Sequence, residues 1–168
     1  MKIKIPYSTQ NIDKKDIKSV NSVLKSNWLT QGPKILEFEK SICNYTGAKY
    51  AVAVSSCTAG LHLSCIVAGI NKSNKIITSP ITFVSSANAA IFCNSKVVLS
   101  DINSNNACLS IEELKKNIKK FKNIKAVMPV HYAGSAEGME DIYRICKKNK
   151  IFVIEDCAHS LGSSYKSG

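Results

Sequence analysis

Asp156 and His159 follow a short apolar, β-branched run at residues 151–154. Such a run predicts a buried strand, and open α/β sheets hold their ligands beyond the carboxyl ends of their strands. A carboxylate fixed there can keep the ring nitrogen of a heteroaromatic cofactor protonated, which such a cofactor needs in order to accept electrons. The pair therefore predicts one end of a cofactor site.

Small and hydroxylated residues, Ser-Ser-Cys-Thr-Ala-Gly at positions 55–60, stand between an earlier apolar run and a helical pattern. Free backbone N–H groups at a helix N-terminus suit a phosphate, and Thr58 could add its hydroxyl and serve as the cap. The alternative is a plain Ser/Thr helix cap without a ligand. The sequence has neither GxGxxG nor GxxxxGK[ST], so the common nucleotide-binding folds lose support.

Three rings lie near the predicted strand ends. Phe83 comes just after the second strand and could stack on a cofactor ring; the alternative is that it packs in the core of the following helix. His62 is expected to pack within its helix. His131 ends the fourth strand close to the predicted site, where a structural hydrogen bond is the alternative to a ligand contact.

The elements that would position these residues alternate along the chain. Strands are predicted at residues 50–54, 75–78, 96–99, 125–130 and 151–154. Helices are predicted at residues 13–25, 33–45, 61–68, 83–92, 110–121 and 139–148. Asp13 would cap the first helix, Pro33 would open the second, and Ser110 with Glu113 matches a capping box. The alternation predicts an α/β sheet, and no repeat or long linker divides the chain, so we expect one domain.

Composition narrows the functional classes. The 168 residues carry 23 Lys+Arg against 12 Asp+Glu, a net charge of +11, but Arg144 is the only arginine and the lysines are dispersed, which argues against a nucleic-acid partner. Seven cysteines form no CxxC pair and no metal-type spacing, and their odd number favours a reducing cytoplasm over a disulfide framework; no metal ligands are assigned. No signal peptide or membrane span is predicted.

The order of the motifs is more specific than any one of them: Ser-Cys-Thr-Ala-Gly, Pro-x-Thr-Phe, Pro-Val-His-x-x-Gly and Glu-Asp-x-x-His-x-x-Gly each follow a predicted strand. Together they resemble the DegT/DnrJ/EryC1/StrS sugar aminotransferases, which are fold-type I enzymes of pyridoxal 5'-phosphate (PLP). The resemblance implies the N-terminal part of a three-layer, aspartate-aminotransferase-like large domain with a mostly parallel sheet. Residues 1–46 would be an N-terminal helical segment and residues 47–168 the cofactor-binding portion.

The resemblance also implies roles for individual residues. Thr58 and Ala59 would contact the cofactor phosphate, Phe83 would stack on the pyridine ring, Asp156 would pair with its nitrogen, and His159 would bond its hydroxyl. Candidate substrate contacts are Tyr7, Asn27, Trp28, Leu29, Thr30 and Cys57. For the segment around Trp28, the alternative is a helix-turn-helix in which the indole simply packs.

The segments IPYSTQNID, NWLTQGPKILEFEK and SPITFVSSANAA look closest to the branch that makes UDP-4-amino-4,6-dideoxy-N-acetyl-β-L-altrosamine for pseudaminic acid. The implied activity is transfer of an amino group, from L-glutamate, to a UDP-linked 4-keto-6-deoxy amino sugar by a cytoplasmic homodimer. Related sugar 3-aminotransferases and dehydratases, the latter with histidine in place of lysine, are alternatives within the enzymes.

One family element departs from this pattern. The family places a Ser-Phe-His-x-x-Lys segment, with the cofactor-binding lysine, after the aspartate motif, and the 168 residues contain no such segment. Lys166 follows Asp156 too closely to replace it, so no catalytic residue is assigned. We expect the chain to be part of a larger fold and inactive alone. A non-catalytic truncated paralogue or a phosphate-binding module is the alternative from another class.

Overall fold

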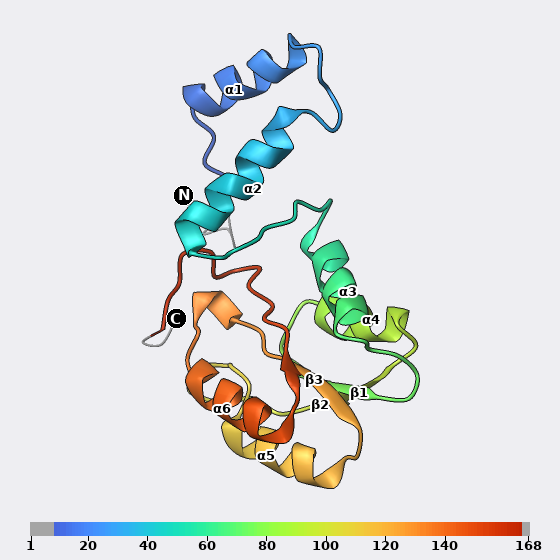
Figure 1. Ribbon diagram of the computed structural model, residues 1–168. Helices are drawn as coiled ribbons and strands as arrows, with labels where there is room; N and C mark the ends of the chain where they lie inside the picture. The colour runs from blue at the N-terminus through green and yellow to red at the C-terminus, as the bar shows by residue number, and fades with distance from the viewer. Residues whose placement is uncertain (1–8, 166–168) are drawn as a thin grey trace, which may run out of the picture. The chain divides into compact units, whose positions relative to one another are not determined.

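The computed structural model describes residues 9–165 (Figure 1). The chain divides into two compact units, Met1–Ala53 and Val54–Gly168, which are called unit 1 and unit 2 below. The assignment of residues 1–46 and 47–168 to two portions of one large domain stays a prediction. Within the described residues, no helix is long and apolar enough to cross a bilayer.

Unit 1 contains helices α1 (Lys14–Leu24) and α2 (Pro33–Thr46), both close to the predicted ranges. Asp13 caps α1: its Oδ1 accepts from the backbone N–H of Asp16 at 3.0 Å, and Asp16 Oδ2 accepts from the N–H of Asp13 at 2.8 Å. This reciprocal pair satisfies two N–H groups that the helix itself cannot use. α2 opens on Pro33 and is capped at its C-terminus by Gly47, whose φ of 75° is one that glycine adopts without strain.

The strand predicted at residues 50–54 is wrong. These residues form no strand in the described structure, and the side chains of Tyr50 and Val52 are 76% and 78% exposed. An extended segment becomes a strand only when a neighbour takes its backbone hydrogen bonds. Here the N–H of Ala53 donates instead to Glu39 Oε1 at 2.8 Å.

Unit 2 is built on a fully parallel sheet, so the predicted α/β class is confirmed. Its strands are β1 (Lys75–Thr78), β2 (Lys96–Leu99), β3 (Ile124–Met128) and β4 (Phe152–Val153), in the order β2-β1-β3-β4. β3 ends earlier than predicted because Pro129 has no N–H to offer to the ladder. A single bridge, Val130 to Asp156, continues the pairing beyond the strands.

Helices cover both faces of this sheet: α3 (Cys57–Val67) and α4 (Ser85–Phe92) on one, α5 (Ile111–Lys120) and α6 (Met139–Asn149) on the other (Figure 1). Successive side chains along each strand point to opposite faces of the sheet, so the core consists of two clusters, one on each face. Ile76 and Met128 pack with α3 and α4, whereas Ile77 and Val127 pack with α5 and α6.

The predicted cap of α5 is confirmed, because Ser110 Oγ accepts from the N–H of Glu113 at 3.4 Å. The reciprocal half of the capping box does not form. The Glu113 carboxylate pairs with Lys116 instead, at 2.6 Å, in an exposed i,i+3 pair.

Candidate functional site

The candidate site lies in unit 2, where the chain leaves the carboxyl ends of β3 and β4. The Asp156 N–H donates to the carbonyl of Pro129 at 2.9 Å, and the His131 N–H donates to the carbonyl of Asp156 at 3.1 Å. Two backbone bonds thus fix the Asp156 main chain beside the loop after β3. The side chain is only 4% exposed, so its carboxylate must find its partners within the protein.

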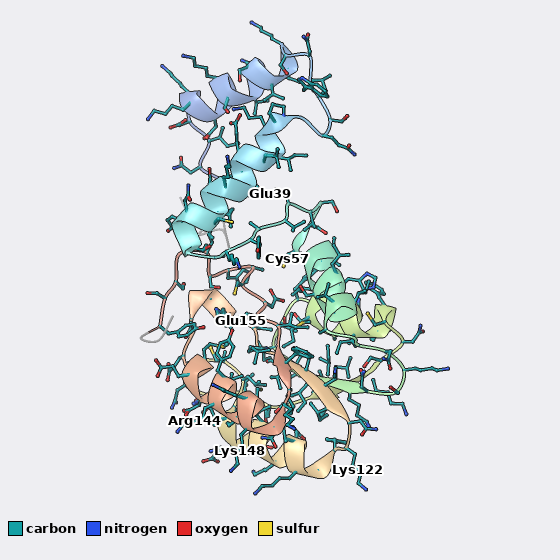
Figure 2. All side chains as sticks on the ribbon, viewed as in Figure 1. Glu39, Cys57, Lys122, Arg144, Lys148 and Glu155 are labelled. Atoms are coloured by element: carbon teal, nitrogen blue, oxygen red, sulfur yellow. The ribbon has the colours of Figure 1, made fainter. Side chains whose placement is uncertain are left out.

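Those partners come from three elements. Ser86 of α4 donates from Oγ to Asp156 Oδ2 at 2.6 Å, and the Ala158 N–H donates to Oδ1 at 3.3 Å. Cys57, the first residue of α3, lies with its sulfur 3.8 Å from Oδ1 (Figure 2 labels Cys57). One carboxylate oxygen is therefore tied to a fully buried hydroxyl, while the other has only a long N–H bond and a weak thiol contact.

The first residues of α4 contact both the N-terminus of α3 and the Asp156 carboxylate. Ser85 Oγ lies 2.6 Å from Thr58 Oγ1 on α3, and Ser86 binds Asp156. Thr82 Oγ1 lies 2.6 Å from Ser86 Oγ and extends this hydroxyl chain. Sequence reasoning gave no role to Ser85 and Ser86. Two adjacent hydroxyl residues at the start of a helix that follows a strand end were the available signal.

The N-terminus of α3 differs from the prediction, because Ser56 is the cap and Thr58 is not. Ser56 has extended backbone angles, and its Oγ accepts from the N–H of Ala59 at 3.2 Å. Thr58 lies inside the helix, which leaves its hydroxyl free to meet Ser85. The amides of Cys57 and Thr58 belong to the first turn, where N–H groups have no partner within the helix. They can serve an anion.

The thiol of Cys57 is neutral at ordinary pH. Partial burial and the neighbouring Asp156 carboxylate both raise its pKa. It can therefore contribute a weak hydrogen bond but not a charge beside the carboxylate.

The side chain of Phe83, which was predicted to stack on a cofactor ring, is exposed and therefore accessible to a ligand. Phe83 is 75% exposed and precedes α4, so the alternative that it packs in the helix core is wrong. Its carbonyl accepts from the N–H of Ser86 at 3.2 Å, which ties its backbone to the start of α4. His159 lies in the turn after Asp156 with an exposed side chain.

The other two histidines have structural partners. His62 meets Phe92 edge to face, with ring centroids 5.4 Å apart, which confirms that it packs within unit 2. His131 is 5% exposed, and its Nδ1 lies 3.0 Å from Ser160 Oγ, so the structural hydrogen bond considered from the sequence is present.

The candidate substrate residues fall into two groups. Asn27, Trp28, Leu29 and Thr30 connect α1 and α2 in unit 1 and are exposed; Trp28 is 61% exposed, so the alternative of a packed indole is not supported. The Trp28 N–H donates to Ser26 Oγ at 3.2 Å, which fixes the turn. Cys57 belongs to unit 2 with the cofactor candidates, and Tyr7 lies outside the described residues.

A glycine is required at position 32, immediately before the first residue of α2. A Cβ at this position would lie 2.7 Å from Trp28 Cβ, well inside van der Waals contact. The close approach of the Trp28 side chain, rather than an unusual φ, explains this glycine, because its φ is −81°.

Comparison with known proteins gives one sequence relative and two solved structures of particular interest. UDP-4-amino-4-deoxy-L-arabinose–oxoglutarate aminotransferase of Shewanella sediminis is 40% identical over 162 residues, covering 96% of this chain and 41% of the relative. The Helicobacter pylori structure of PseC, an aminotransferase involved in pseudoaminic acid biosynthesis, aligns with a TM-score of 0.87 and 33% identity, over 96% of this chain and 43% of that one. NtdA from Bacillus subtilis, solved with bound cofactor PMP, aligns with a TM-score of 0.82 and 27% identity over 87% and 33%.

The chain spans about 40% of the length of the curated relatives that it matches. Its sheet and helices superpose on part of the aminotransferase large domain, which confirms the predicted fold. The model of the DegT/DnrJ/EryC1/StrS aminotransferase family matches residues 10–167, nearly the whole sequence. The chain therefore belongs to the DegT/DnrJ/EryC1/StrS aminotransferase family.

Proposed function

We propose that this chain is the cofactor-binding N-terminal part of a PLP-dependent sugar-nucleotide aminotransferase. The observation that carries the proposal is the link through α4, in which Ser85 meets Thr58 and Ser86 meets Asp156. Through this link the start of α4 contacts both a buried carboxylate and the first turn of α3, whose amides can serve an anion. These are the two kinds of group that a phosphorylated pyridine needs at its opposite ends.

The residues present fit this cofactor. Thr58, Ala59 and the first turn of α3 would hold the phosphate, and the exposed ring of Phe83 would cover the pyridine face. Asp156 would hold a proton on the ring nitrogen through the oxygen that Ser86 leaves free, and His159 would bond the ring hydroxyl. When bound, PLP supplies an electron sink that stabilises negative charge at the reacting carbon.

The buried environment of Asp156 indicates how the protein would assist the chemistry of the cofactor. The hydrogen bond from Ser86 fixes the rotamer of the carboxylate. A fixed carboxylate in a site of low dielectric holds a proton on a neighbouring nitrogen more strongly than a solvated one. We infer that Ser86 holds the Asp156 carboxylate in position and that Thr82 holds the Ser86 hydroxyl.

For the substrate, we propose a UDP-linked 4-keto-6-deoxy amino sugar, with L-glutamate as the amino donor. UDP-4-amino-4,6-dideoxy-N-acetyl-β-L-altrosamine would be the product, in pseudaminic acid biosynthesis. The structural similarity to the Helicobacter pylori enzyme supports this choice, and the Shewanella relative supports a UDP-linked 4-amino sugar more generally. Tyr7, Cys57 and the turn from Asn27 to Thr30 would contact the sugar nucleotide in a cytoplasmic homodimer.

Cofactor binding can be tested on the chain itself by equilibrium dialysis with PLP. Asp156→Asn keeps the size of the side chain but removes its charge, so we expect at least a tenfold loss of affinity, about 1.4 kcal/mol. Asp141→Asn, on the exposed surface of α6, is the matched control and should bind as the unmodified chain does. Equal affinity for all three proteins would contradict the assigned role of Asp156.

The sugar can be tested with a chimera that joins residues 1–168 to the C-terminal portion of the Helicobacter pylori enzyme. We expect amino transfer from L-glutamate to the UDP-linked 4-keto-6-deoxy hexose to exceed transfer to the corresponding UDP-linked 4-keto pentose. PLP absorbance of the purified chimera verifies assembly. A loaded chimera that prefers the pentose would contradict the proposed sugar while leaving the aminotransferase assignment intact.

A further inference from the structure

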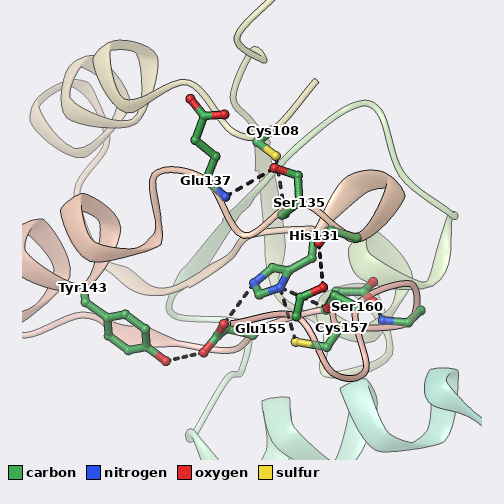
Figure 3. Close-up of polar contacts among 12 residues, drawn as sticks. Cys108, His131, Ser135, Glu137, Tyr143, Glu155, Cys157 and Ser160 are labelled. Carbon is green, nitrogen blue, oxygen red and sulfur yellow. Dashed lines mark hydrogen bonds and ion pairs between the residues drawn. The ribbon is translucent and has the colours of Figure 1, made fainter. Parts of the chain in front are cut away.

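His131 contacts the turn that carries His159 at two points. Its backbone N–H donates to the Asp156 carbonyl at 3.1 Å, and its ring Nδ1 lies 3.0 Å from Ser160 Oγ (Figure 3). Asp156 and Ser160 are 4% and 6% exposed, whereas the three residues between them, 157–159, are exposed. One residue of the loop after β3 therefore holds both ends of the exposed segment.

The His131 ring is itself held from its other side. Nε2 pairs with Glu155 Oε2 at 2.9 Å, and the Tyr143 hydroxyl of α6 donates to the other oxygen of that carboxylate. Contacts with the Cys157 sulfur and the Glu155 carboxylate raise the pKa of His131 to about 10, so both ring nitrogens carry a proton at pH 7. Nδ1–H donates to Ser160 Oγ rather than to the Cys157 sulfur at 3.7 Å, because the oxygen is closer and is the stronger acceptor.

The loop after β3 also follows the turn beyond this contact. Ser163 Oγ donates to the carbonyl of Gly134 at 2.8 Å. A Cβ at Gly134 would lie 3.3 Å from the His159 carbonyl oxygen, and the φ of 87° is one that glycine adopts without strain. The loop at residues 131–134 therefore lies directly against the His159 backbone.

We propose that His131 is a positioning residue, which holds the turn at residues 157–163 so that His159 meets the ring hydroxyl of the cofactor. The proposal rests on the proposed function, in which His159 bonds that hydroxyl. Because the His159 side chain is exposed, its place depends on the backbone that carries it, and His131 fixes that backbone on either side. Groups that bind a ligand must be held within about 0.5 Å of the productive geometry by residues that are themselves fixed.

Two substitutions separate the roles of the two ring nitrogens. Asparagine brings an amide nitrogen near the position of Nδ1 and can donate to Ser160, whereas glutamine reaches the position of Nε2 and can donate to Glu155. His131→Asn should therefore retain the positioning and His131→Gln should lose it. Ser160→Ala removes the same bond from the other side. Ser95→Ala is the matched control, because Ser95 is 7% exposed and its hydroxyl donates to the Asn74 carbonyl at 2.9 Å, before β2 begins.

The functional measurement is the preference of the chain for the cofactor hydroxyl. Equilibrium dialysis compares pyridoxamine 5'-phosphate, whose amine forms no imine with lysine, with its 3-deoxy analogue, which lacks only the ring hydroxyl. We expect the unmodified chain, Ser95→Ala and His131→Asn to prefer the hydroxyl form about fivefold, the effect of one hydrogen bond. His131→Gln, Ser160→Ala and His159→Ala should each lower the preference to below about twofold.

This preference distinguishes positioning from a general loss of structure. Partial unfolding lowers the affinity for both ligands equally, so it leaves their ratio unchanged. In the His159→Ala background, His131→Gln should have no further effect on the ratio, because the group that it positions is absent.

Amide hydrogen exchange, measured by NMR, follows the turn without any ligand. The Ser160 N–H donates to the Cys157 carbonyl at 3.0 Å, and the Ser163 N–H donates to the Ser160 carbonyl at 2.9 Å. These two amides should exchange about fivefold faster in His131→Gln and in Ser160→Ala than in the unmodified chain, with the core strands as reference. In His131→Asn and Ser95→Ala their rates should be those of the unmodified chain.

The outcomes separate this proposal from the proposed function. Unchanged exchange in folded His131→Gln and Ser160→Ala, or an undiminished preference for the hydroxyl form, overturns the positioning role. Equal binding of both ligands by the unmodified chain contradicts the contact of His159 and with it this proposal. A chain that binds neither ligand contradicts the proposed function, and the exchange rates then decide whether His131 holds the turn. If circular dichroism shows that His131→Gln unfolds, Ser160→Ala tests the same bond.

Discussion

Replacing Ser86 by alanine tests the hydroxyl that supports Asp156. Ser86 is fully buried and donates to Asp156 Oδ2 at 2.6 Å, and the carboxylate is itself 4% exposed. Hydrogen bonds to charged groups contribute about 1.5–3 kcal/mol, and a buried group left without its partner pays the desolvation cost. We therefore expect Ser86→Ala to lower the free energy of unfolding by about 2 kcal/mol. Urea titration at pH 7, followed by circular dichroism, measures this change.

A double-mutant cycle separates the charge-assisted bond from loss of packing. Asp156→Asn removes the charge but keeps the shape, so Ser86→Ala in that background should cost about 1 kcal/mol less than in the wild type. The neighbouring Ser85→Ala is the matched control. Its hydroxyl meets Thr58, and its effect should not depend on residue 156. If the effects of Ser86→Ala and Asp156→Asn add to within about 0.5 kcal/mol, the inferred support of the carboxylate is wrong.

Three further predictions concern other parts of the chain. The folded-state pKa of His131 is raised from 6.5 to about 10, so its stabilising contribution should be complete below pH 6.5 and should be lost as the pH rises towards 10. Urea unfolding across this range should show the decline, and His131→Gln should remove most of it. Gly32→Ala places a Cβ 2.7 Å from Trp28 Cβ, so it should destabilise unit 1 by about 1–3 kcal/mol. The fluorescence of Trp28, the single tryptophan, measures this change during urea unfolding. An unchanged unfolding transition would exclude the clash. Borohydride treatment of the 168-residue chain with PLP should leave no single modified lysine, because the Ser-Phe-His-x-x-Lys segment is absent from it; one stoichiometric adduct at Lys166, which lies outside the described residues, would refute this.

Local signals in the sequence were sufficient for much of the architecture. Asp13, Ser110 and Pro33 mark helix starts because capping and the fixed φ of proline act over three or four residues. The runs at β1 and β2 were predicted with their observed bounds, since buried parallel strands are continuous apolar segments. Asp156 was predicted as a strand-end acid for the same reason.

Only the tertiary structure decided which groups are partners. Tyr50 and Val52 have strand-forming side chains, yet no neighbour in the described structure takes their backbone bonds, and pairing cannot be read from one segment. Ser86 and Asp156 are 70 residues apart, and they meet because the segments that follow the parallel strands β1 and β4 both leave the carboxyl ends of the sheet. His131 and Cys157 meet because β3 and β4 are adjacent. The sequence by itself determined which chemical groups follow the strands, since that depends on neighbouring residues. The order of the strands determined which of those groups touch, because that order results from long-range packing.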